Sequence, residues 1–286
     1  MSATLGEILN SHRTHKPVVM GVLNVTPDSF SDGGRFLDAG AAIAQSGQMA
    51  ADGADIIDVG AESTRPGSQR VGADEQIRRI KPVLPEVTKL DAIVSIDTTS
   101  SAVAGFALDA GARIINDVSA GRDDSEMFPL AASRGAVLIL MHMLGDPKSM
   151  QENPQYDDVV KEVRDFLAGR IEAAVDAGVE RNRLIVDPGI GFGKNLEHNL
   201  ALLGHIKVLV ELGAAVLVGP SRKRFIGEIS GQSDPSGRVG GTIAAVLAAF
   251  RGGATIFRVH DVAATVQALA VARAIGKREH RRTDDG

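Results

Sequence analysis

The chain has 286 residues, of which 44% are hydrophobic and 3% aromatic, with no Cys, and its formal net charge is −5. This composition excludes disulfides, thiolate catalysis and Cys-ligated zinc, and the acidic balance argues against a general nucleic-acid surface. No apolar stretch is long enough to span a membrane and no signal-peptide core is present, so we expect a cytoplasmic protein that does not bind membranes.

Short apolar runs alternate with Ala- and Leu-rich stretches of helical spacing. After a polar N-terminal segment, 1–16, the runs predict strands at 18–25, 54–60, 92–97, 113–118, 136–142, 183–187, 215–219 and 255–260. Eight repeats of buried strand and amphipathic helix are typical of a (β/α)8 barrel. We therefore predict an α/β fold with a single (β/α)8 TIM barrel over 17–276, followed by a charged C-terminal tail at 277–286.

The helices between these strands have recognisable start and break signals. A helix is expected at 39–51, and another starts near Ser100, which is a suitable N-cap. The helical pattern at 73–89 is interrupted by Pro82 and Pro85, which leaves the ends of that helix open.

Each predicted strand ends on a polar or charged residue. These residues are Asn24, Asp58 and Glu62, Asp97, Asn116, His142, Asp187, Ser221 and Lys223, and Arg258 and His260. Barrel enzymes carry their chemistry at the carboxyl ends of the strands, so the residues are candidates for an active site.

Strand alternation predicts which side chains face the barrel interior. In the last strand, Arg258 and His260 share a face, while Phe257 and Val259 take the face that packs on helices. The same alternation turns inward the residues Asp58, Asp97, Asn116 and Asp187. One buried carboxylate is as readily a structural ion pair, but several together favour a functional site. Asp117 and Asp261 fall on the opposite face, as expected of helix caps.

Three loops suggest ligand contacts. In the loop 24–34, glycines permit mobility and Phe30 could cover a ligand, while Arg65 in the loop 62–67 suits a phosphate. The segment 189–194 places three glycines around Phe192 but matches neither G-x-G-x-x-G nor a P-loop, which excludes a nucleotide-binding fold and leaves close approach to a flat ligand.

Two clusters near the C-terminus are basic. Ser221 precedes Arg222, Lys223 and Arg224, and Lys223 shares the inward parity of Ser221, so it can meet a carboxylate, a ligand carbonyl or form a Schiff base. The pair Arg258 and His260 lies just before the start of a helix, where an anion is favoured.

Together these motifs resemble the dihydropteroate synthase family. The match includes 21–34 (GVLNVTPDSFSDGG), 55–60 (DIIDVG), 62–67 (ESTRPG), 95–98 (SIDT), 115–118 (INDV), 141–142 (MH), 187–189 (DPG), 221–223 (SRK) and 258–261 (RVHD). The motifs cover most of the chain in the order of the family. The resemblance implies a barrel transferase, usually a homodimer, that joins 6-hydroxymethyl-7,8-dihydropterin diphosphate to 4-aminobenzoate in folate synthesis.

The resemblance also implies a role for each matching residue. The pterin site would be Asp58, Asp97, Asn116, Met141, Asp187 and Lys223; the diphosphate site would be Asn24, Arg65, Arg258 and His260; the 4-aminobenzoate side would be Phe30, Thr64, Pro66, Phe192 and Ser221. Asn24 would hold Mg²⁺, and the catalytic set would be Asp32, Asp97, Lys223, Arg258 and His260.

The implied chemistry is a dissociative substitution. Mg²⁺, Arg258 and His260 would stabilise the departing diphosphate, Asp97 the positive charge on the pterin, and Asp32 the closed site. The chain departs from the family at Ala61, where Gly is frequent, and has Pro220 before Ser221. Because the positions of Arg65, Pro66 and Phe192 match, sulfonamides, which imitate 4-aminobenzoate, are expected inhibitors.

Three other functions remain open at this point. A methyltransferase acting on methyltetrahydrofolate and a corrinoid protein would share the pterin carboxylates but would not use Asn24, Arg65, Arg258 and His260. A Schiff-base aldolase would use Lys223 and could be trapped with borohydride. A binding protein without activity is disfavoured, since every motif position has a chemically able side chain.

Overall fold

The computed structural model describes residues 3–26, 35–62, 68, 70–145, 150 and 153–283. Eight parallel strands close into one barrel in which each strand pairs with its neighbours in sequence and β8 pairs with β1. The strands are β1 (Val18–Asn24), β2 (Ile56–Gly60), β3 (Ile93–Asp97), β4 (Ile114–Asp117), β5 (Val137–Met141), β6 (Leu184–Asp187), β7 (Ala215–Val218) and β8 (Ile256–Val259). The predicted (β/α)8 fold is confirmed.

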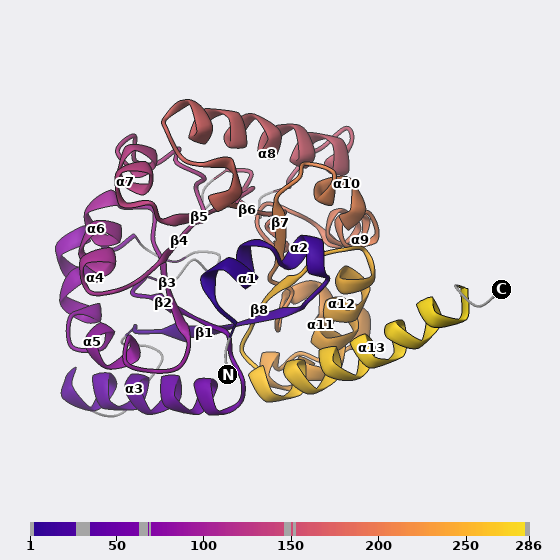
Figure 1. The fold of residues 1–286 in the computed structure, drawn as a ribbon, viewed down its shortest axis with the longest axis horizontal. Helices are drawn as coiled ribbons and strands as arrows, with labels where there is room; N and C mark the ends of the chain where they lie inside the picture. Colours follow the sequence, from indigo (N-terminus) through magenta and orange to yellow (C-terminus); the bar gives the residue numbers. More distant parts are fainter. Residues whose placement is uncertain are drawn as a thin grey trace.

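Most of the helices surround the barrel in sequence order, and the two at the N-terminus lie across one end of it (Figure 1). In chain order the helices are α1 (Leu5–Leu9), α2 (Ser11–Thr14), α3 (Arg35–Ala51), α4 (Ala73–Ile80), α5 (Leu84–Val87), α6 (Ser101–Asp109), α7 (Met127–Arg134), α8 (Val159–Asp176), α9 (Leu196–Gly204), α10 (Ile206–Val210), α11 (Arg224–Ser230), α12 (Val239–Arg251) and α13 (Val262–Thr283), with 3₁₀ turns η2 (Arg181–Arg183) and η3 (Pro235–Arg238). None of the helices described is long and apolar enough to cross a membrane.

The helical region predicted at 73–89 is divided into α4 and α5. Pro82 has no backbone N–H and opens the break, and Pro85 then occupies the first turn of α5, where proline is tolerated. Ser100 lies at the N-cap position of α6 with extended backbone, as expected, but Asp124 Oδ2 accepts the hydrogen bond from the N–H of Ser101 at 2.7 Å. The last helix, α13, continues to Thr283, through part of the segment expected to form the charged tail.

Two apolar layers follow the strand alternation. One set of strand residues, which includes Phe257 and Val259, packs under the helices. The other set, which includes Met20, Ile56 and Ile185, fills the barrel interior. Branched aliphatic residues suit strands that are buried on both faces, so an interior poor in aromatics packs well.

The N-terminal segment closes the bottom of the barrel. Ala3 and Ile8 are buried and belong to the same cluster as the inward residues Val18 and Ile256, where the strands begin. Asp55 accepts hydrogen bonds from the N–H groups of Ala3 and Val19, which ties the segment to β1. This end of the barrel is thus sealed, and the polar strand ends gather at the other end.

Candidate active site

A pocket lies at the carboxyl ends of the strands. Its lining residues are Asp97, Asn116, Val118, Met141, Asp187, Ile190, Phe192, Gly219, Lys223 and Arg258. All five polar residues in this lining were predicted, either from strand alternation or from the loop after β7. One wall is apolar, because Phe192 packs on Val118 and Met141, together with Met143 and Met150.

Arg258 ties the floor of the pocket together. Its Nε donates to Asp58 Oδ2 at 2.7 Å and its Nη2 donates to Asp97 Oδ2 at 2.7 Å. Asn116 Nδ2 also donates to Asp58 Oδ2, at 3.0 Å. The strand register explains how Arg258 reaches Asp97. Asp97 lies opposite Asn116 of β4 on one side and Gly60 of β2 on the other, and the missing side chain of Gly60 leaves room for the guanidinium. Asp58 is fully buried and supports Asn116 and Arg258 from below.

Asp187 and Lys223 face the pocket from β6 and from the loop after β7. Asp187 Oδ1 accepts a hydrogen bond from the N–H of Gly189 at 2.7 Å, which fixes the carboxylate at the strand end. Gly189 has φ +66°, and a side chain there would meet the carbonyl oxygen of His142. Lys223 precedes α11, and its Nζ lies 4.0 Å from the centre of the Phe192 ring, in cation–π contact.

Burial changes the ionisation of the two pocket carboxylates. It raises the pKa of Asp97 to about 7, although the charge of Arg258 opposes the shift. It raises the pKa of Asp187 to about 6, against the hydrogen bond from Gly189 and the charge of Lys223. Both groups can therefore change protonation state near neutral pH.

These shifts predict how stability depends on pH. Because both pKa values in the folded chain exceed the 3.8 of an ordinary Asp, the folded state binds more protons, and these groups lose stabilising effect as pH rises from about 4 to about 7. Asp97→Asn cannot ionise, so its melting temperature relative to wild type should increase as pH is raised from about 5 to about 8. Thermal unfolding of both proteins across this range checks the prediction; a difference that is constant or that shrinks contradicts it.

His260 and Ser221 form a pair at the pocket rim. Ser221 Oγ lies 3.0 Å from His260 Nδ1 and accepts from the N–H of His260 at 3.1 Å. Burial, with the charge of Arg258, lowers the pKa of His260 to about 3. The imidazole is thus neutral near pH 7, so it would offer an anion a neutral hydrogen bond.

Asn24 is the predicted metal ligand. It is half-buried at the end of β1, and its Oδ1 points towards Gly60 at the end of β2. Within the described part of the chain, no cluster of three or more His, Cys, Asp or Glu could hold a metal ion. A single amide oxygen fits Mg²⁺ that keeps several waters and is bound mainly by the phosphates of a substrate.

Several predicted residues lie outside the described residues or away from the pocket. Outside the described residues lie Phe30, Asp32, Thr64, Arg65 and Pro66. Glu62 was counted among the polar strand ends expected at the active site, but its carboxylate accepts hydrogen bonds from the N–H of Val71 and from Gln76 Nε2. It supports the loop before α4 instead of lining the pocket.

The expectation that Asp117 caps a helix is wrong. Asp117 is fully buried and accepts hydrogen bonds from the N–H groups of Ser119 and Gly121, so it shapes the turn after β4. Asp261 lies directly before α13, and its carboxylate pairs with Arg222, with distances of 3.0 and 2.6 Å to Nε and Nη2. This ion pair links the loops after β7 and β8.

His142, which had no assigned role, is buried in a structural contact. Lys194 Nζ lies 3.0 Å from His142 Nδ1, and the Phe166 ring contacts the imidazole edge to face at 4.9 Å. Lys194 is 2% exposed and was not singled out by the sequence. It follows a glycine-rich loop, where no periodicity predicts the direction of a side chain.

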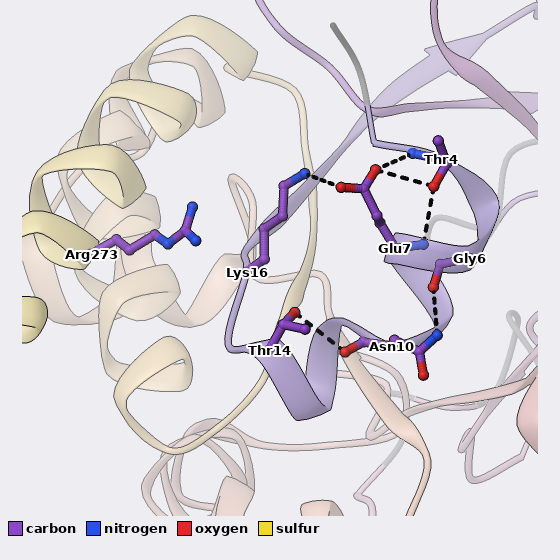
Figure 2. A pocket seen from close by; sticks show the side chains of 7 residues that line it. All are labelled: Thr4, Gly6, Glu7, Asn10, Thr14, Lys16 and Arg273. Carbon is purple, nitrogen blue, oxygen red and sulfur yellow. Dashed lines mark hydrogen bonds and ion pairs between the residues drawn. The ribbon is translucent and has the colours of Figure 1, made fainter.

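A second pocket lies beside the N-terminal helices (Figure 2). Its lining includes Glu7, which forms a capping box with Thr4 and an ion pair of 3.0 Å with Lys16. Arg273 approaches from α13 on the opposite side. The polar contacts here cap and tether the short helices at the sealed end of the barrel, so this pocket lacks the convergent strand-end chemistry of the first.

The fold and the first pocket define a barrel enzyme whose site suits a flat, polar-edged ring. The family model for pterin binding enzymes matches residues 20–260. The dihydropteroate synthase of Mycobacterium leprae is 49% identical over 261 residues, which cover 88% of this chain and 91% of that protein. The chain therefore belongs to the dihydropteroate synthase family, whose members are transferases of folate biosynthesis.

Solved structures agree with this assignment. The dihydropteroate synthase of Xanthomonas albilineans with 4-aminobenzoic acid superimposes with a TM-score of 0.87 at 47% identity, covering 91% of this chain and 93% of that one. The Yersinia pestis dihydropteroate synthase with a sulfonamide drug gives 0.86 at 42% identity, covering 92% and 95%.

Proposed function

We propose that this chain joins 6-hydroxymethyl-7,8-dihydropterin diphosphate to 4-aminobenzoate, giving 7,8-dihydropteroate and diphosphate, with the polar strand ends divided by task. The observation that carries the proposal is the meeting of Asp97, Asn116, Asp187 and Lys223 in one pocket with an apolar wall. A small number of oriented polar groups in a largely apolar cavity is the usual form of a small-molecule site.

The pocket complements a pterin ring. The ring edge alternates donors and acceptors, which carboxylates and an amide can match, and Lys223 can donate to the ring carbonyl. Asn116 is held in one orientation by its bond to Asp58, and Asp187 by the N–H of Gly189. Met141, in the apolar wall of the pocket, can cover a face of the ring. A pre-oriented site of this kind binds without a large ordering cost.

The diphosphate would lie between the ends of β1 and β8. Arg258 and His260 lie just before the N-terminus of α13, where backbone N–H groups favour an anion. Asn24 would hold Mg²⁺, together with the diphosphate oxygens, and Arg65 would add a second guanidinium. When bound, the metal would offset negative charge on the leaving diphosphate.

The substitution begins with the bond between the pterin methylene carbon and the diphosphate oxygen. Diphosphate leaves with the electron pair, and the cation left behind is stabilised by conjugation with the pterin. The carboxylate of Asp97 lines the pocket and would stabilise this positive charge. The amine nitrogen of 4-aminobenzoate then forms the new bond and loses a proton to solvent.

The 4-aminobenzoate would bind on the side of Phe192 and Ser221. Ser221 is held by His260, so the two substrates meet where the loops after β7 and β8 touch. Phe30, Thr64 and Pro66 would complete this side, with Asp32 in the loop that closes it. Sulfonamides would compete here, as analogues of 4-aminobenzoate.

Product analysis tests the proposed function. Purified protein with the pterin diphosphate, 4-aminobenzoate and Mg²⁺ should form dihydropteroate and diphosphate in equal amounts, and chelation of Mg²⁺ should slow the reaction. A dissociative path also predicts slow diphosphate release when 4-aminobenzoate is omitted. Absence of dihydropteroate, or transfer of a methyl group from methyltetrahydrofolate to a corrinoid protein, would reject the proposal.

We also propose a cytoplasmic homodimer, which rests on the family resemblance and on the composition of the chain. Light scattering during size-exclusion chromatography measures the mass in solution, and twice the chain mass of 29.9 kDa is the expected value. A mass of one chain at micromolar concentration would contradict the dimer.

A further inference from the structure

Lys194 is a buried lysine next to the proposed active site. It is 2% exposed, and a buried ammonium is costly unless its donors are satisfied. Burial lowers its pKa to about 7, and the charge of Asp187 opposes that shift. The contribution of Lys194 must therefore come from the hydrogen bonds of its amino group, which an apolar side chain would lack.

The ammonium has three donors and three acceptors surround it. Lys194 Nζ donates to the carbonyl of Phe192 at 2.8 Å, and lies 3.0 Å from His142 Nδ1 and 3.4 Å from the carbonyl of His142. Burial, with the charges of Lys194 and Arg122, lowers the pKa of His142 to about 2, so the imidazole is neutral. A neutral ring with its proton on Nε2 accepts at Nδ1, which completes the set.

These contacts hold the segment that carries Phe192. Gly191 and Gly193, on either side of Phe192, have φ +81° and +61°, so the segment has little backbone preference of its own. Side-chain contacts fix it: Tyr156 Oη donates to the carbonyl of Gly193 at 2.8 Å, and Lys194 Nζ donates to the carbonyl of Phe192. His142, at the end of β5, anchors the ammonium to the barrel.

Phe192 links this network to the chemistry. Its ring is the surface on which Lys223 Nζ lies, at 4.0 Å from the ring centre, and it forms part of the pocket wall. A shift of the Phe192 backbone would move this ring out of the side of the pocket proposed to bind 4-aminobenzoate. We propose that Lys194, anchored by His142, is a positioning residue that holds Phe192 in place and thereby sets the affinity for 4-aminobenzoate; this rests on the proposed function of the pocket.

The test compares Michaelis constants for the two substrates. Lys194→Met keeps an unbranched side chain that is one atom shorter and has no donors. It should raise KM for 4-aminobenzoate about tenfold while KM for the pterin diphosphate changes less than about twofold. Lys161→Met is the matched control, since Lys161 is exposed on α8 and pairs with Asp165. It should leave both constants unchanged. Equal changes in both constants for Lys194→Met, or none, would overturn the proposal.

A histidine pair keeps the test decisive if Lys194→Met folds poorly. His142→Asn retains an acceptor near the position of Nδ1, and His142→Leu removes it. The leucine variant should raise KM for 4-aminobenzoate and the asparagine variant should restore it to within about twofold of wild type. Identical behaviour of the two variants would contradict the role of the anchor.

A double-mutant cycle shows whether Lys194 acts through Phe192. In a Phe192→Ala background, Lys194→Met should change KM for 4-aminobenzoate less than about twofold, because the ring that it positions is gone. Additive effects would overturn the proposal. The wild-type protein in the same assay tests the function separately, since activity with both substrates is required before the variants are compared.

Discussion

Replacing Arg258 with Ala is expected to lower turnover by about 100- to 1000-fold and to destabilise the protein by about 3 kcal/mol. The guanidinium lies between two buried carboxylates, with 2.7 Å to each. Its removal leaves Asp58 and Asp97 facing each other without a cation, and raises the pKa of Asp97 further, because Arg258 is the group that lowers it. The diphosphate would also lose a donor in the transition state.

Steady-state kinetics and chemical unfolding measure the two effects. Arg258→Lys keeps the charge but not the fork that reaches two carboxylates, so it should lie between wild type and the alanine variant. Arg134→Ala is the control, since Arg134 pairs with Asp109 at the surface, where an ion pair contributes about 1 kcal/mol or less. Wild-type turnover in Arg258→Ala would refute its role in the reaction.

Replacing Lys223 with Ala is expected to raise KM for the pterin diphosphate about 10- to 100-fold, with a smaller change in turnover. Lys223 can donate to the ring carbonyl, and its charge lowers the pKa of Asp187 across the pocket. Without it, Asp187 should protonate at higher pH and match the ring edge less well. Both effects act on the bound pterin, so binding should suffer more than chemistry.

The measurement is the pair of Michaelis constants and the turnover number, determined with both substrates varied. Lys207→Ala on α10 is a suitable control, since Lys207 lies at the surface away from the pocket. Loss of turnover with an unchanged KM for the pterin would assign Lys223 to the chemical step. A borohydride-trapped adduct on Lys223 would instead favour the Schiff-base alternative.

Strand alternation predicted the pocket well because a closed barrel gives each strand one inward face. Once Arg258 is placed inward, its parity fixes Phe257 and Val259 against the helices, and the structure confirms all three. Register then brings Asp97 beside Asn116 without any long-range information in the sequence. Periodicity of this kind is the strongest signal that a sequence contains.

Residues beyond the strand ends were less predictable, since a loop has no period. Lys194 reaches His142 at the end of β5 from a loop in which Gly189, Gly191 and Gly193 have positive φ, and no periodic pattern predicts that direction. Asp117 lies on the outward face, as predicted, but turns to the N–H groups of its own loop, which are nearer than those of α7. The N-terminal segment is polar in sequence, yet Ile8 is fully buried, because α1 turns Leu5, Ile8 and Leu9 to the barrel interior.

The protonation states of the site residues could not be predicted from the sequence either. The sequence placed Arg258 and His260 together where an anion is favoured, but only the structure shows that burial beside a guanidinium keeps the imidazole neutral. Arg258 likewise uses two of its three nitrogens on carboxylates. The spacing of residues along the strands predicts which groups lie close together, whereas the pKa of each group depends on how deeply it is buried and on which charges surround it.

The division of the strand ends by task is tested most directly by calorimetric titration with two ligands, 6-hydroxymethyl-7,8-dihydropterin and its diphosphate, the latter with Mg²⁺. Asp187→Asn should raise the dissociation constants of both ligands by the same factor, about 10-fold or more, because both contain the pterin ring. Asn24→Ala should weaken only the diphosphate. If both variants weakened both ligands equally, the separation of pterin binding from diphosphate binding would be contradicted.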